Sequence, residues 1–145
     1  MAQSTKKESQ LSHVGHAMIG DTLAIPILQC DLLEEIQNLH KEDAWQQGTG
    51  PSSKTLVKHS DLRIVLLAMR KKMCMSEHRT AARISVQTLA GHIRLRLPDR
   101  TVDLLTGQLL VLDQCVLHAV EAEEDSAFLL TLSWHGQGSD TCETD

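Results

Sequence analysis

The chain has 145 residues, of which 41% are hydrophobic and only 2% aromatic, and its formal net charge is −5. This length suits a single domain whose core is built from aliphatic side chains. Few aromatic residues, and no basic run longer than Arg70-Lys71-Lys72, argue against nucleic acid as a partner. The charge balance argues against an anionic membrane, and no run approaches the roughly 20 apolar residues of a membrane span.

The N-terminal residues and the cysteines bear on the compartment. The segment Met1–Lys7 is polar and no apolar region follows it, so a secretory signal is not expected. Cys30, Cys74, Cys115 and Cys142 include no Cys-x-x-Cys pair, and a chain of this length does not depend on disulfides for stability. We therefore expect a cytoplasmic protein with reduced thiols.

The first third of the chain contains one predicted helix. Residues 1–20 are polar without periodicity and are predicted to form a disordered tail, and residues 21–50 form a helical lead-in. Asp31–His40 is the predicted helix, because Asp31 is a good N-cap and Glu34 follows three residues later. Its expected apolar stripe consists of Leu32, Leu33, Ile36, Leu39 and His40. The helix ends before the breaker cluster Gly48-Thr49-Gly50-Pro51.

From residue 51 to residue 135 the pattern changes to short β segments separated by turns. Eight strands are predicted, over Lys54–His59, Arg63–Met69, Ile84–Leu89, His92–Leu97, Thr101–Leu105, Leu109–Leu112, Leu117–Glu121 and Ala127–Trp134. Strict alternation in His92–Leu97 places Ile93, Leu95 and Leu97 inward. This series predicts an all-β sandwich or barrel, with residues 136–145 as a flexible C-terminal tail.

Few residues offer recognisable chemistry. Neither a glycine-rich phosphate loop nor a Gly-x-Ser-x-Gly elbow occurs, and the acidic run Glu121–Asp125 is interpreted as a solvated hairpin loop. His78 and His118 remain, each in a segment with apolar neighbours. Imidazoles from separate strands can converge in a barrel and bind Zn, Mn, Fe or Ni, although protein sites usually need three or four ligands. The alternative is that both histidines make ordinary hydrogen bonds in a pocket.

The order of the segments resembles a small single-domain cupin. The resemblance is carried by Glu77–Thr80, Ile84–Gly91, Thr106–Leu112 and His118–Ala122, and it spans residues 53–134, which are most of the chain expected to be ordered. It implies an all-β fold of the double-stranded β-helix (jelly-roll) kind, a barrel with one short N-terminal helix. It also implies a homodimer, because small cupins commonly pair through sheet edges.

Two cupin motifs can be placed on the chain, and they imply a degenerate metal site. With the first motif anchored on Gly91, its two histidines fall on His78 and Thr80 and its glutamate on Ile84. The second motif starts at Gly107 and places its histidine on His118. Its proline, its glycine and its asparagine fall on Asp113, Cys115 and Ala122. The resemblance thus implies that two of the four metal ligands are kept, while Gly91 and Gly107 serve turns.

The neighbours of the two histidines leave several alternatives open. Thr80, Ile84 and Cys115 are candidates to line the pocket. Gln87 would complete a metal site only if a bulge turned it inward, since alternation places it on the face opposite Ile84. The Cys115 thiol is either reactive beside the imidazole or a buried structural cysteine.

Two functions from different classes follow from these residues. The first is a non-catalytic or small-molecule-binding module, favoured by the missing metal ligands. The second is a metal-dependent cupin enzyme of oxygenase or isomerase type, which would use His78 and His118 to hold Mn, Fe, Ni or Zn. No other cofactor is expected, and a fold relic serving only assembly is a third interpretation.

Overall fold

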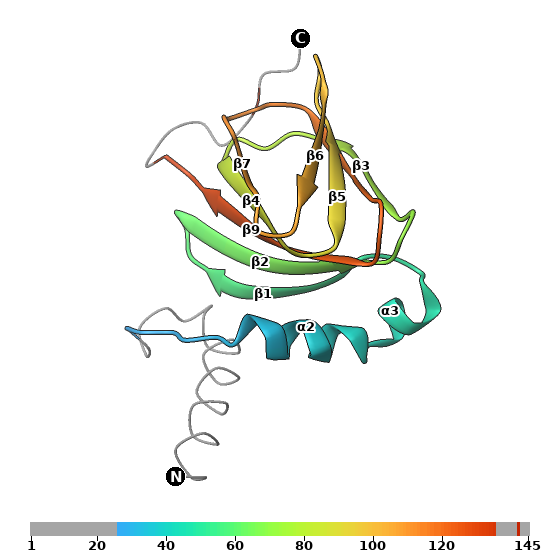
Figure 1. The fold of residues 1–145 in the computed structure, drawn as a ribbon. Coiled ribbons are helices and arrows are strands. Elements are labelled where there is room, and N and C mark those ends of the chain that lie inside the picture. Colours follow the sequence, from blue (N-terminus) through green and yellow to red (C-terminus); the bar gives the residue numbers. More distant parts are fainter. Residues whose placement is uncertain (1–25, 136–141, 143–145) are drawn as a thin grey trace.

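The computed structural model describes residues 26–135 and Cys142, and these residues form two short helices followed by nine strands (Figure 1). The helices are α2 (Leu32–His40) and α3 (Asp43–Gln47). The strands are β1 (Ser52–Lys58), β2 (Leu62–Met69), β3 (Cys74–His78), β4 (Arg83–Ala90), β5 (His92–Arg96), β6 (Thr101–Leu105), β7 (Leu109–Leu112), β8 (His118–Ala122) and β9 (Ser126–Ser133).

The strands form two antiparallel sheets, so the predicted all-β class is confirmed. The larger sheet has the order β1-β2-β9-β4-β7 and the smaller sheet the order β3-β8-β5-β6. One core cluster draws on both sheets, with Leu67, Val86 and Phe128 from the larger and Leu95 and Val120 from the smaller. A jelly roll fits two such sheets with apolar inner sides. Closure into a complete barrel stays a prediction.

All eight predicted strands are present within a few residues of their expected bounds, but β3 was not predicted. Its five residues are exposed except for half-buried Met75, so the segment has no hydrophobic periodicity to mark it. It is a strand because it pairs with β8, with Cys74 opposite Glu121 and His78 opposite His118. A register shift between Met75 and His78 marks a bulge in this pair.

Helix α2 begins as predicted, but one residue of its expected apolar stripe is wrong. The Asp31 carboxylate accepts hydrogen bonds from the backbone N–H groups of Leu33 and Glu34 at 3.1 and 3.2 Å. Ile36 and Leu39 are buried against the outer side of the larger sheet. The side chain of Leu33, however, is 70% exposed.

Glu35 occupies the buried side of α2 in place of Leu33. Its carboxylate accepts a hydrogen bond from Lys54 Nζ on β1 at 2.6 Å, and both side chains are largely buried. A buried carboxylate is tolerated because this partner compensates its charge. The ion pair therefore holds α2 against β1, in addition to the apolar contacts of Ile36 and Leu39.

The lead-in contains a second helix where the sequence predicted only one. Helix α3 has five residues, its Trp45 is buried, and the ring of His40 stacks on Trp45 with centroids 4.2 Å apart. Gly48 ends the helix in the left-handed conformation with a φ of 64°, which agrees with the predicted breaker. The helix is too short to produce an amphipathic pattern in the sequence.

The two glycines expected at turns both have positive φ. Gly91 joins β4 to β5 with a φ of 84°, and Gly107 lies between β6 and β7 with a φ of 87°. Both conformations favour glycine, so the predicted turn roles are confirmed. At Gly91 a side chain would also overlap the backbone carbonyl of Asp125 and the hydroxyl of Ser126.

The outer side of the smaller sheet is charged, as the alternation in β5 predicted. Ile93 and Leu95 are fully buried. Arg94 pairs with Asp103 at 2.9 Å and Arg96 pairs with Glu121 at 2.6 Å. Because Glu121 belongs to β8, the interpretation of the whole acidic run as a solvated loop is wrong at its first residues.

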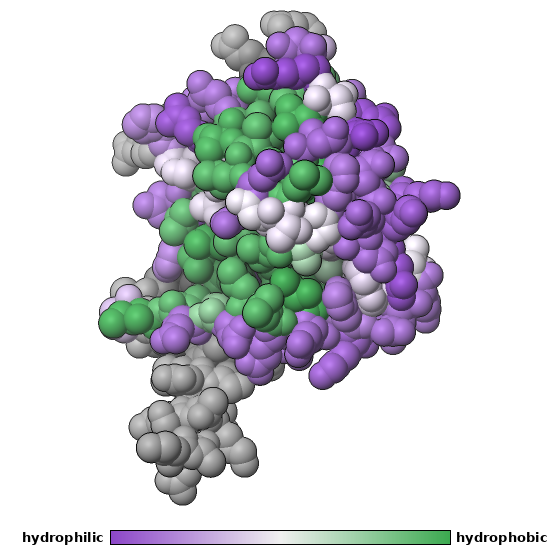
Figure 2. All heavy atoms as spheres, viewed as in Figure 1, coloured by the Kyte–Doolittle hydropathy of each residue, from purple (hydrophilic) through white to green (hydrophobic). Residues whose placement is uncertain are grey.

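Apolar side chains gather on other parts of the surface. Figure 2 shows them gathered over the part of the molecule where β7 and its neighbouring strands lie, and again toward α2. Leu109 and Val111 of the edge strand β7 are more than half exposed, at 59% and 55%. No helix in the described part of the chain is long and apolar enough to cross a membrane.

Candidate functional site

The structure brings His78 and His118 together at one end of the smaller sheet. His78 is the last residue of β3 and His118 is the first residue of β8, and they are opposed in the strand register. Their ring centroids are 4.3 Å apart with the ring planes 61° apart. The convergence expected of two histidines on separate strands is therefore present, and we refer to this end of the fold as the histidine end.

Both imidazoles are oriented by the same local hydrogen bond. Nδ1 of His78 lies 3.0 Å from the carbonyl oxygen of Ser76, and Nδ1 of His118 lies 2.8 Å from that of Val116. Because a carbonyl oxygen only accepts hydrogen bonds, each Nδ1 carries the proton. In the neutral rings Nε2 is then the acceptor, and no residue of the described chain bonds to either Nε2.

The two histidines differ in burial and therefore in electrostatics. His118 is only 4% exposed, whereas His78 is exposed. Burial lowers the pKa of His118 below its ordinary value, an effect that the hydrogen bond to Val116 opposes and the neighbouring His78 strengthens. His118 therefore favours the neutral form with a lone pair on Nε2, which is the form that accepts a hydrogen bond or a metal ion.

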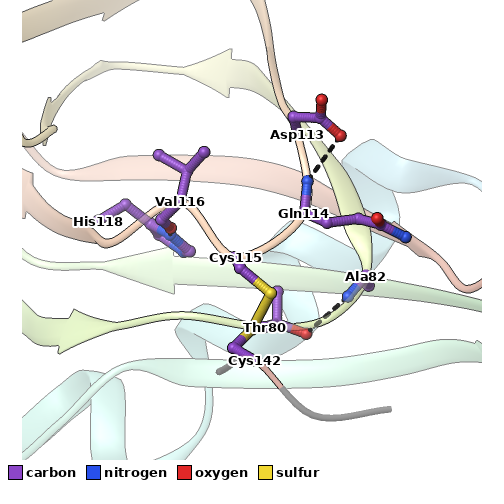
Figure 3. The surroundings of a disulfide bond; sticks show 8 residues. All are labelled: Thr80, Ala82, Asp113, Gln114, Cys115, Val116, His118 and Cys142. Atoms are coloured by element: carbon purple, nitrogen blue, oxygen red, sulfur yellow. Dashed lines mark hydrogen bonds between the residues drawn. A yellow bond between two sulfur atoms is a disulfide. The ribbon is translucent and has the colours of Figure 1, made fainter. Parts of the chain in front are cut away.

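The loop between β7 and β8 contacts the segment that follows His78 and leads directly into His118, and Figure 3 shows its residues beside Thr80 and His118. The backbone N–H of Cys115 donates to the carbonyl oxygen of Thr80 at 2.8 Å, which ties this loop to the one that follows His78. The Thr80 hydroxyl accepts from the N–H of Ala82 at 3.2 Å. Thr80 and Cys115, two predicted pocket residues, are thus in contact, and the Thr80 hydroxyl is occupied by its own turn.

Asp113 holds the start of the same loop. Its carboxylate accepts from the backbone N–H of Gln114 at 2.8 Å and from the Arg83 guanidinium at 3.0 Å, and these two contacts lower its pKa. The Arg83 side chain is 56% exposed and pairs with Asp113. The loop is therefore held at its start by β4 and in its middle by Thr80.

The expectation of four reduced thiols is wrong, because Cys115 and Cys142 form a disulfide (Figure 3). The sequence contained no sign of it, since the two residues are 27 apart in a chain long enough to be stable without disulfides. Cys115 is also one of two non-glycine residues with a positive φ in the described chain, at 62°. The disulfide answers the open question about this cysteine: it is bonded and is not a free thiol.

Ile84 and Gln87 are not part of the histidine pair's polar surroundings. Ile84 is 2% exposed and belongs to the core cluster between the sheets. Gln87 is exposed on the opposite side of β4, as the alternation required. The register of β4 against β9 shifts only between Thr88 and Ala90, beyond Gln87, so no bulge turns Gln87 inward.

The residues present do not fit a four-ligand metal centre. In the described chain, no group of three or more His, Cys, Asp or Glu side chains is placed to hold an ion. The positions of two expected ligands hold Thr80, whose hydroxyl bonds its own turn, and Ile84, a hydrocarbon in the core. Two imidazoles alone bind a transition metal weakly.

Sequence reasoning missed a polar hollow next to this loop. A hollow of about 180 Å³ is lined by Arg83, Gln114, Ser133, Trp134 and His135. Arg63 lies over the Trp134 ring at 5.4 Å from its centroid, and its buried Nε has no hydrogen-bond partner within the described residues. A signal existed in the sequence, because Arg63 occupies the inward position of the β2 alternation that continues at Val65 and Leu67.

Comparison with known proteins places the fold. No family model and no curated protein matches the chain. A conserved protein of unknown function from Streptococcus pyogenes superposes with a TM-score of 0.62 at 23% identity, covering 77% of this chain and 91% of that one. A cupin superfamily protein from Desulfitobacterium hafniense gives 0.57 at 18% identity, covering 59% and 78%. KdgF from Halomonas sp. gives 0.56 at 19% identity, covering 59% and 82%.

These neighbours and the two-sheet topology define the class of protein: the chain has the cupin fold. The cupin resemblance predicted from the ordering of the sequence segments is thereby confirmed at the level of fold. At identities below 25% the likeness extends to the fold and not to a reaction or ligand.

Proposed function

We propose that the chain is a small cupin-fold module that binds a small molecule at the histidine end without catalysing a reaction on it. The observation that carries this proposal is the His78–His118 pair. Both rings are oriented by backbone carbonyls and both leave Nε2 available, but the other two ligand positions hold Thr80 and Ile84. A binding site needs only the first property, whereas a cupin metal centre needs the remaining ligands as well.

The chemistry of the pair favours a ligand with hydrogen-bond donors. The Nε2 atom of a neutral imidazole accepts a hydrogen bond, so the two rings suit a hydroxyl or amino group. The hollow of about 180 Å³ is lined by neither histidine, so its polar residues, among them Trp134 and His135, are not part of this proposal.

Metal content separates this proposal from an enzyme. Protein purified without any chelator would be analysed by inductively coupled plasma mass spectrometry as wild type, as the double variant His78→Ala/His118→Ala, and as His59→Ala. His59 is exposed between β1 and β2, so its variant removes an imidazole without touching the pair. We expect metal far below one ion per chain in all three proteins. Near-stoichiometric Mn, Fe, Ni or Zn that only the double variant loses would overturn the proposal.

That overturning result would favour the second candidate, a metal-dependent cupin enzyme of oxygenase or isomerase type. The observation in its favour is that neither Nε2 has a protein partner in the described chain while both Nδ1 atoms do. This is the usual arrangement of a metal-binding histidine, whose second nitrogen donates to a carbonyl or carboxylate. Water or the ligand itself would then have to complete the coordination sphere.

We also propose that the protein is a homodimer that pairs through β7. This strand is the edge of the larger sheet, and its Leu109 and Val111 are more than half exposed. Figure 2 shows apolar side chains over the part of the molecule where β7 lies. An exposed apolar edge strand is a common site of self-association. Size-exclusion chromatography with light scattering should show a dimer for wild type and for Leu33→Lys, and a monomer for Leu109→Lys/Val111→Lys. A monomeric wild type would refute the pairing.

We also propose that the protein is located in the cytoplasm. Its proposed partners are small molecules and a second copy of the chain, and neither nucleic acid nor a membrane is proposed as a partner. Disulfides in cytosolic proteins are usually transient and respond to the redox state. Cells lysed in a thiol-alkylating agent should therefore contain the chain in the soluble fraction, mostly with alkylated cysteines. Recovery only in an exported fraction, with the Cys115–Cys142 bond complete, would contradict this location.

A further inference from the structure

The disulfide closes at the β7–β8 loop, which contacts the surroundings of both histidines. Cys115 lies in the middle of the β7–β8 loop, between Asp113, which Arg83 holds, and Val116, whose carbonyl accepts from His118. Its own N–H donates to Thr80, two residues after His78. The loop therefore transmits the position of Cys115 to the backbone beside each imidazole.

The backbone at Cys115 is strained, and the disulfide is a restraint that acts on it. A non-glycine residue at a φ of 62° costs roughly 1–2 kcal/mol relative to a right-handed or extended conformation. The bond to Cys142 holds the side chain of that residue at a fixed place, with the two Cα atoms 5.5 Å apart. A residue in a strained conformation keeps that conformation only where many surrounding contacts hold it, and such residues often belong to switches.

We infer that the Cys115–Cys142 disulfide is a redox-controlled restraint that sets the orientation of the His78–His118 pair. In the oxidised chain the loop is fixed, so the Val116 carbonyl holds His118 in the Nδ1-protonated form with Nε2 available. In the reduced chain Cys115 loses one of the contacts that maintain its positive φ, and the hydrogen bond from His118 to Val116 weakens. The inference rests on the proposed function, in which this pair is the binding site.

The chemistry balances with a low-molecular-weight disulfide such as oxidised glutathione as oxidant. One protein thiolate attacks that disulfide, which gives a mixed disulfide and releases one thiol. The second protein thiolate displaces the remaining small thiolate and forms the Cys115–Cys142 bond. The protein thiols are oxidised by two electrons in total, and the small disulfide is reduced to two thiols that take up the protons. A dithiol reverses the reaction.

The test measures the imidazoles directly and needs neither a ligand nor a metal. Long-range proton–nitrogen NMR spectra of the full chain distinguish an Nδ1-protonated ring from a mixture of tautomers by the separation of its two nitrogen shifts. Spectra would be recorded after treatment with oxidised glutathione and after treatment with a dithiol. Cys142→Ser removes the disulfide by changing a residue that lies outside the strands. Cys74→Ser is the matched control, because Cys74 is an exposed thiol on the same strand as His78.

We expect widely separated nitrogen shifts for His118 in oxidised wild type and in oxidised Cys74→Ser. The separation should narrow in reduced wild type and in Cys142→Ser under both conditions. Identical His118 shifts in the oxidised and reduced protein would overturn the inference and leave the disulfide as a simple attachment of the C-terminal segment. Because no ligand is present, this result would leave the proposed binding function standing, and the metal analysis tests that function separately.

Discussion

Comparing Gly91→Ala with Gly107→Ala separates the cost of backbone strain at a positive φ from the cost of a steric overlap. Both glycines have nearly the same positive φ, at 84° and 87°, so alanine at either position costs roughly 1–2 kcal/mol in backbone strain. The loss of glycine's freedom in the unfolded chain returns roughly 0.4–1 kcal/mol. At Gly107 nothing lies within 4 Å of an added Cβ, so we expect a net destabilisation of only about 1 kcal/mol.

At Gly91 the added Cβ would overlap the Asp125 carbonyl and the Ser126 hydroxyl and lie 2.9 Å from the Ser126 Cα atom. That hydroxyl accepts from the N–H of His92 at 3.0 Å and donates to the Glu124 carbonyl at 2.7 Å. Displacing it costs about 1 kcal/mol for each of these two hydrogen bonds, and relieving the overlap adds roughly 1–3 kcal/mol. Together with a net backbone strain of about 1 kcal/mol, as at Gly107, we therefore expect Gly91→Ala to destabilise by roughly 4–6 kcal/mol.

Urea unfolding followed by tryptophan fluorescence measures both effects at one redox state. With a slope of about 2 kcal/mol per M, the midpoint should fall by about 0.5 M for Gly107→Ala and by roughly 2–3 M for Gly91→Ala. The slope should not change. Equal losses for the two variants would refute the reasoning, since they would mean that conformational strain alone accounts for both and that the contacts around Gly91 do not matter.

Three further predictions concern the helix, the ion pair and pH. Asp31→Ala removes the α2 cap and should lower the free energy of unfolding by about 1 kcal/mol, measured by urea unfolding. Glu35→Gln leaves the buried Lys54 ammonium uncompensated and should cost about 2 kcal/mol by the same measurement, whereas Glu35→Gln/Lys54→Met should recover much of it. Burial lowers the pKa of His118, so the unfolded chain takes up a proton at a higher pH than the folded one. The contribution of neutral His118 to stability should therefore be fully present above about pH 6.5 and be lost as the pH falls through the folded pKa. The urea midpoints of His118→Gln should fall less than those of wild type over the same pH range.

Most of the fold was predictable because its signals are local. The alternation that buries Ile93 and Leu95, the cap at Asp31 and the turns at Gly91 and Gly107 are each determined by a few neighbouring residues. Strand β3 was not predictable in this way. Its side chains are mostly exposed, and only its pairing with the distant β8 makes it a strand.

The site was predictable only where the motif and the pairing coincide. His78 and His118 were expected to converge because they occupy two ligand positions of the cupin motifs, and β3 and β8 place them opposite each other. The disulfide was not predictable, because no spacing rule relates Cys115 to Cys142. Arg63 was overlooked because a charge at an inward position was treated as part of an apolar strand.

The loop before His118 shows how the fold and the chemistry of the site separate. Cys115 occupies the position of a glycine in the cupin motif, and it still has the positive φ that such a glycine provides. The backbone requirement at this position is therefore met even though the residue that normally meets it is absent. The cysteine side chain, which stands where a glycine has only a hydrogen atom, is the one bonded to Cys142. At Thr80 and Ile84, where the resemblance places two metal ligands, the chain has a turn hydroxyl and a core hydrocarbon. The backbone therefore keeps the geometry that the fold requires at Cys115, whereas it requires no particular side chain at Thr80 and Ile84.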